Sequence, residues 1–102
     1  MQEDNNFYAA FNYINKEYIK RAFEKEGWVS RKSSWTDFEL SNSWSELTLE
    51  GEDKSPLLNG AVDFCEENVE VLNRIFISLN SEYQYEFYDE DKNLILQKSN
   101  GN

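Results

Sequence analysis

The sequence contains no histidine, one cysteine, one proline and four isolated glycines. Without histidine, the chain lacks the usual general base at neutral pH, the Ser-His-Asp and Cys-His catalytic groups, and histidine metal ligands. The lone cysteine, Cys65, excludes a disulfide within the chain, and the scattered glycines do not form a phosphate-binding loop. Carboxylate pairs of the glycosidase type are present by residue type, but on a small domain such groups are usually solvated charges. We therefore expect a protein that is not an enzyme and has no cofactor.

Long apolar runs are also missing. No stretch reaches the roughly 20 mostly apolar residues that a membrane-spanning helix needs. The opening residues MQEDNN are polar and acidic, unlike a secretory apolar segment. A cytosolic compartment, without membrane contact, is the simplest expectation. A chain of 102 residues is expected to form a single domain (1–102), whose core needs neither disulfide nor metal.

Positive charge is scarce after the first third of the chain. The net charge is −10, and residues 1–34 carry six bases and five acids, so the remaining residues carry −11. This excess of acids disfavours direct binding to nucleic acid, which is itself a polyanion. A basic protein is the partner that such a charge would attract. Solubility alone is the other explanation of an acidic chain.

The most regular pattern in the sequence is helical. Over residues 57–79, apolar residues recur at i, i+3 and i+4 spacing, and acids occupy the opposite face. This pattern predicts an amphipathic helix, with Cys65 as a small buried residue on its apolar face. A second helix is predicted over 16–26, because Asn15 is a suitable N-cap and Gly27 a suitable terminating residue.

Alternating apolar residues predict four strands. The first two cover about 34–41 and 44–51, and the second two follow the long helix as YQYEFY (83–88) and LILQ (94–97). The resulting fold class is α+β: an antiparallel four-stranded sheet with two helices on one face, in the order helix, hairpin, helix, hairpin. The other face of the sheet is expected to stay exposed, as antiparallel sheets allow.

Two segments fit more than one structure. Residues before Asn15 show both the spacing of a helix and the alternation of a strand. Trp28 to Ser30 either begins an additional strand or leads into the first hairpin. The sequence leaves both segments open, and it makes no prediction of the oligomeric state.

Residues 89–93 resemble the start of a calcium-binding loop, because Asp89, Asp91 and Asn93 have the required spacing. A complete loop needs glycine at its sixth position and glutamate at its twelfth. The chain has Leu94 and Asn100 there. We therefore expect an acidic hairpin turn and no metal site.

Three acidic groups stand out, one after the first hairpin, one along the predicted long helix and one in the second turn. Like charges at i, i+3 and i+4 destabilise a helix by a few tenths of a kcal/mol per pair, so this helix face is a candidate recognition surface. A solvated face is the alternative. Aromatic side chains near these groups would act as anchors, unless they pack in the core or on the sheet. The candidate partner-binding residues are Glu50, Glu52, Asp53, Asp63, Glu66, Glu67, Glu70, Asp89, Glu90, Asp91, Trp35, Trp44 and Tyr88.

In size, charge, scarcity of cysteine and expected order of elements, the chain resembles the small acidic immunity proteins of bacterial toxin–immunity pairs. The resemblance implies a cytosolic protein that binds a cognate toxin, often a basic nuclease, and blocks its active site or substrate surface by occlusion. Two other functions remain open. One is a nucleic-acid mimic that inhibits a DNA- or RNA-binding protein, and the other is a small accessory or chaperone-like subunit.

Overall fold

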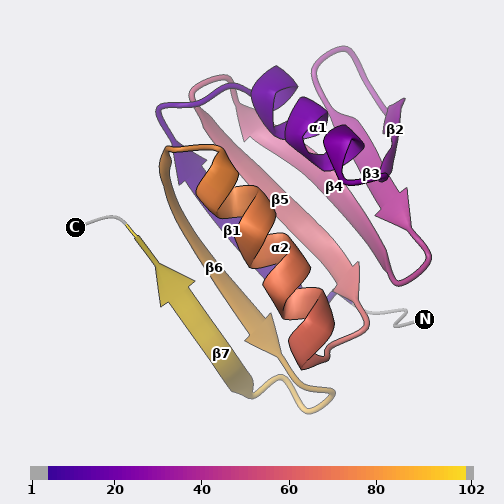
Figure 1. Cartoon of the computed structure of the whole chain (residues 1–102), viewed down its shortest axis with the longest axis vertical. Coiled ribbons are helices and arrows are strands. Elements are labelled where there is room, and N and C mark those ends of the chain that lie inside the picture. The colour runs from indigo at the N-terminus through magenta and orange to yellow at the C-terminus, as the bar shows by residue number, and fades with distance from the viewer. Residues whose placement is uncertain (1–4, 101–102) are drawn as a thin grey trace.

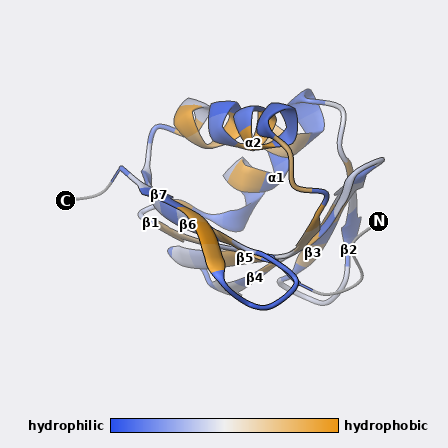
Figure 2. Ribbon diagram, turned by 90° about the horizontal axis from the view of Figure 1, so that it is seen from below, coloured by the Kyte–Doolittle hydropathy of each residue, from blue (hydrophilic) through white to orange (hydrophobic). Residues whose placement is uncertain are grey.

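The computed structural model describes residues 5–100, which form a seven-stranded antiparallel sheet with two helices packed on one face (Figures 1 and 2). The first four residues of the polar opening segment lie outside this range. Across the sheet, the strand order is β2-β3-β4-β5-β1-β6-β7. The elements in chain order are β1 (Phe7–Asn12), α1 (Lys16–Lys25), β2 (Val29–Lys32), β3 (Phe38–Asn42), β4 (Ser45–Glu52), β5 (Ser55–Val62), α2 (Glu66–Ser78), β6 (Glu82–Tyr88) and β7 (Leu94–Ser99).

The predicted four-stranded sheet with helix-hairpin-helix-hairpin order is wrong. Three further strands, β1, β2 and β5, belong to the same sheet in the described residues. In β1 the strand alternation decides the structure, because Phe7, Ala9 and Phe11 are buried while the residues between them face the other side. Of the two alternatives for Trp28 to Ser30, the additional strand is the one found, since Val29 and Ser30 are the first residues of β2, which pairs with β3.

The predicted helix over 57–79 is wrong in its first part. Leu57 to Val62 belong to β5, and α2 begins only at Glu66. The physical reason is long-range pairing, because β5 matches β4 along its whole length from Ser55 to Val62 and pairs with β1 on its other side. At Gly60 a side chain would collide with the backbone of β4, with an added Cβ only 2.8 Å from the Cα atom of Leu47. Local spacing could not show this pairing.

The prediction that Cys65 is buried is also wrong. Cys65 is the exposed N-cap residue of α2, and its side chain makes no capping hydrogen bond. Because α2 begins at Glu66, Cys65 lies just before the helix and is not part of its apolar face. The buried residues of α2 are Leu72, Ile75 and Phe76.

The predicted strand over about 34–41 begins later, since β3 starts at Phe38, whereas three other local predictions are confirmed. The side chain of Asn15 caps α1 by accepting a hydrogen bond from the Tyr18 amide at 3.1 Å. Gly27 follows the C-cap with φ of +90°, a conformation that glycine adopts without strain. In β6, the predicted alternation holds, since Tyr83, Tyr85 and Phe87 face the core.

Phe76 of α2 lies at the centre of the core between the helices and the sheet. Its ring centroid is 5.3 Å from that of Phe11, 5.4 Å from that of Tyr85 and 6.2 Å from that of Phe23 in α1. The two helices cover only one face of the sheet (Figure 2). The opposite face therefore presents the side chains between the core positions of each strand, as predicted for an antiparallel sheet.

Candidate functional site

Asn6 joins the segment before α2 to the segment after β6. Its side chain is almost completely buried, donates from Nδ2 to the carbonyl of Val62 at 2.9 Å and accepts from the Val62 amide at 2.8 Å. Its own carbonyl accepts a hydrogen bond from the Tyr88 amide at 2.8 Å. Since acids follow directly after both Val62 and Tyr88, this asparagine holds two acidic segments at one end of the molecule.

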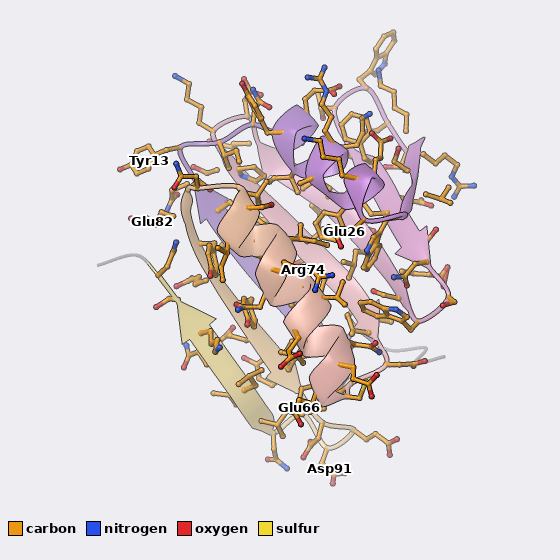
Figure 3. The ribbon with its side chains drawn as sticks, in the orientation of Figure 1. Tyr13, Glu26, Glu66, Arg74, Glu82 and Asp91 are labelled. Atoms are coloured by element: carbon orange, nitrogen blue, oxygen red, sulfur yellow. The ribbon has the colours of Figure 1, made fainter. Side chains whose placement is uncertain are left out.

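A ring contact links the same two segments. The ring of Phe64, which precedes α2, lies 5.0 Å from the ring of Phe87 in an edge-to-face arrangement. Figure 3 shows Glu66 and Asp91 at the same end of the molecule, away from Tyr13 and Glu82. We call this region the acidic end. It consists of Asp63, Glu66, Glu67, Asp89, Glu90 and Asp91.

Some carboxylates of the acidic end have a structural role. Glu66 and Glu67 occupy the first turn of α2, where the helix dipole favours negative charge. The carboxylate of Asp89 accepts hydrogen bonds from the amides of Asp91 and Asn93, both at 2.9 Å. These backbone hydrogen bonds, that of Asn93 foremost, lower the pKa of Asp89. Asp89 therefore organises the turn, whereas the carboxylates of Glu90 and Asp91 beside it are not used in this way.

Half of the basic side chains in the described residues form salt bridges, all of them away from the acidic end, whereas Lys92 lies in the acidic turn itself. Salt bridges join Lys16 to Asp37, Lys20 to Glu17 and Glu24, Arg21 to Glu17, Arg31 to Glu39, and Arg74 to Glu26. Arg74, one helical turn after Glu70 on α2, reaches across to Glu26 of α1 at 2.9 Å (Figure 3). Within residues 5–100, Glu66, Glu67, Glu70, Glu90 and Asp91 take part in no salt bridge.

The structure does not bring the first acidic group to the acidic end. Glu50 lies on the uncovered sheet face, where its carboxylate accepts a hydrogen bond from Asn59 Nδ2 at 2.6 Å. Glu52 and Asp53 are exposed at the turn between β4 and β5. That turn is at the opposite end of β5 from Val62, roughly 25 Å away at the rise of a β-strand.

Beside Glu50, the uncovered sheet face carries four acids that sequence reasoning missed: Glu39, Glu46, Glu82 and Glu86. They are single acids at alternate strand positions, so their common face becomes visible only when the register is known. A hollow of about 940 Å³ lies on this face over β2 to β5, with Arg31, Glu39, Glu46 and Thr48 in its lining. Arg31 and Glu39 pair across it, so part of the charge is already neutralised.

The three candidate aromatic anchors lie in different places. Trp35 is 91% exposed in the loop between β2 and β3, whereas Trp44 is half-buried at the turn beyond β3, edge-on to Trp28 at 5.1 Å. Trp44 therefore serves the core. Tyr88 is half-buried beside the acidic end and packs edge-on against Tyr8 at 5.7 Å. Burial, with the nearby Glu86 adding to it, raises the pKa of Tyr88.

A second exposed aromatic site was also missed. Tyr13 is 84% exposed with φ of +64°, an unusual conformation for a bulky residue. It borders two hollows of about 470 and 760 Å³, together with Asn80 and Ser81. In the sequence, Tyr13 continues the alternation of Phe7, Ala9 and Phe11, which would place it on the core face, but β1 ends at Asn12 and Tyr13 lies in the connection to α1.

Taken together, these observations describe a compact α+β fold with six carboxylates gathered at one end. No three His, Cys, Asp or Glu side chains in the described part of the chain are placed to hold a metal ion. Neither helix in residues 5–100 has the length and apolar character needed to cross a membrane. No family model, curated protein or solved structure matches the chain.

Proposed function

We propose that this protein binds and neutralises a basic protein, and that it acts as the immunity protein of a bacterial toxin–immunity pair. The acidic end carries the proposal. Two segments far apart in the sequence meet there through Asn6, and they bring six carboxylates to one end of the molecule. Within residues 5–100, Glu66, Glu67, Glu90 and Asp91 of this end take part in no salt bridge, so their charge is available to a partner.

Occlusion is the mechanism that this surface supports. Carboxylates at the acidic end would pair with Lys and Arg side chains that a toxin needs for its own substrate, such as the phosphates of a nucleic acid. The net charge of −10 would also speed the encounter with a cationic surface. Phe64, 46% exposed beside the acids, supplies an apolar contact of the kind found at the centre of interfaces.

A pair of charge-reversal variants tests this function. Glu67→Lys with Glu90→Lys changes both segments of the acidic end, and both side chains are exposed. Against a basic toxin domain encoded beside this gene, titration calorimetry should show binding weakened by more than about tenfold, or about 1.4 kcal/mol. Thermal unfolding should show an intact fold, because neither substitution removes a core contact.

The matched control is Glu52→Lys with Asp53→Lys, which changes the net charge equally at the opposite end of β5. It should leave binding within about twofold of the unmodified protein, because screening limits its effect at that distance. Equal weakening by both double variants would assign binding to total charge rather than to the acidic end. Unchanged binding in the first double variant would exclude the acidic end as the interface.

A further inference from the structure

The two edges of the sheet differ in their protection. The edge strand β2 is only four residues long and carries exposed Arg31 and Lys32. Arg31 pairs with Glu39 on β3, and the ammonium of Lys32 lies 5.9 Å from the ring centre of Trp35. A short, charged edge strand discourages pairing with another chain. The β2 edge is therefore closed to strand addition.

The opposite edge, β7, lacks these protections (Figure 1). It has six residues, no proline and a single charged side chain, Lys98. Leu94 and Ile95 are 48% and 44% exposed at its start, next to the acidic turn. A longer strand with exposed apolar residues is a suitable template for an incoming strand.

Asn100 holds the far end of β7 in place. Its side chain accepts a hydrogen bond from the Tyr83 amide at 2.7 Å and donates one to the carbonyl of Ser81 at 2.9 Å. Its amide donates to the carbonyl of Tyr83 at 3.1 Å. The strand is thus fixed along its length, so a partner would not have to order it on binding.

The Asn100–Tyr83 hydrogen bond also shows which backbone groups of β7 are open. In an antiparallel pair, successive residues alternate between facing the neighbouring strand and facing away from it. Since the Asn100 amide faces β6, that of Lys98 does as well. The N–H and C=O groups of Gln97 and Ser99 therefore point away from the sheet, as an open row of donors and acceptors.

The charges around this edge select its occupant. The acidic end lies at the start of β7, and Glu86 on the uncovered face accepts a hydrogen bond from Gln97 at 3.4 Å. We propose that β7 receives an extended, basic strand of the partner protein, which adds to the sheet by hydrogen bonds to Gln97 and Ser99. This inference rests on the proposed function and specifies how that partner binds.

A second copy of this chain fits the edge less well. Each copy carries a net charge of −10. If two β7 strands paired in antiparallel fashion, the acidic turn of each copy would also lie near Glu82 of the other copy. Like charges would then face each other, whereas a basic strand would pair with both groups of acids.

Two variants at one position separate backbone from side-chain binding. Gln97→Pro removes the outward amide and places a ring in the path of an incoming strand, yet proline is tolerated on the open side of an edge strand. Gln97→Ala keeps the amide. The probe is a short blocked peptide of alternating lysine and valine, added to the isotope-labelled full chain and followed by NMR.

In the unmodified protein and in Gln97→Ala, the peptide should shift the backbone amide signals of positions 97 and 99 and slow the hydrogen exchange of these amides. Gln97→Pro should bind at least about tenfold more weakly. The same peptide with alternate backbone nitrogens methylated should fail to bind the unmodified protein. This peptide control keeps the test decisive if thermal unfolding shows that Gln97→Pro disturbs the fold.

Strand addition at β7 would be overturned if the peptide did not bind, or if the methylated peptide bound equally well. Equal binding by a folded Gln97→Pro, or a dimer that Gln97→Pro dissociates, would also overturn it.

Other outcomes separate this inference from the proposed function. Signal shifts confined to α2 and the 89–91 turn, with Gln97→Pro binding normally, would overturn strand addition but leave the proposed function standing. Conversely, loss in Gln97→Pro without loss in Glu67→Lys with Glu90→Lys would support the edge and contradict the acidic end.

Discussion

Asn6 takes part in four hydrogen bonds that join three strands. Its amide donates to Gly60, its side chain both donates to and accepts from Val62, and its carbonyl accepts from Tyr88. The amide group of an asparagine side chain offers a donor and an acceptor together without carrying a charge. Aspartate would offer acceptors alone and would bring a buried charge. The position of the acidic end therefore depends on an uncharged residue.

Replacing Asn6 by alanine should destabilise the protein by about 2–4 kcal/mol, because the amide and carbonyl of Val62 lose their buried partner. Urea unfolding measures this change. The control is Asn12→Ala, which removes an exposed hydrogen bond to Glu82 and should cost less than about 1 kcal/mol. If the two variants unfold at the same urea concentration, Asn6 does not hold the segments together.

At the scale of single elements, local signals predicted α1 well and β5 poorly. Asn15 caps the start of α1 and Gly27 terminates it, so the bounds of this helix can be predicted from residues next to it in the sequence. The residues of β5 have apolar positions that also match a helix, and their strand conformation comes from pairing with β4 and β1. Such pairing overrides local propensity and is invisible in a short window of sequence.

The start of α2 lends itself to a direct test. Cys65 has the extended backbone of an N-cap residue but makes no side-chain hydrogen bond. Serine at this position can accept a hydrogen bond from an open amide of the first turn, so Cys65→Ser should stabilise the protein by about 0.5–1 kcal/mol. Cys65→Ala is the control without an acceptor. Equal urea midpoints for the two variants would mean that the amides of this turn are satisfied in another way.

At the scale of the whole molecule, the excess of acids lies after residue 34. The acid runs were visible in the sequence, and so was the shortage of bases after residue 34. The meeting of the two segments at the acidic end was not visible, because it depends on Asn6, which is 56 positions from its partner Val62. The acids of the uncovered sheet face were hidden for a related reason, since only the register places them together.

This excess of acids should make the stability of the protein depend on salt concentration. Raising sodium chloride from low to physiological concentration should increase the unfolding temperature, because screening weakens repulsion among acids that have no nearby base. Calorimetric scans at several salt concentrations measure the effect. Glu67→Lys with Glu90→Lys should reduce the slope. A fall in unfolding temperature with salt would instead mean that the ion pairs around α1 dominate the electrostatic energy.

The central place of β1 has a consequence for how the chain is made. β1 pairs with β5 on one side and β6 on the other, and both partners come much later in the chain: Ala10 pairs with Leu57, 47 positions on, and with Gln84, 74 positions on. On the ribosome, β1 emerges early and must wait without a neighbour until β5 has left the exit tunnel. Its second side stays open longer still, until β6 has emerged as well. Such late, distant pairing slows folding and leaves an apolar strand exposed to chaperones during synthesis.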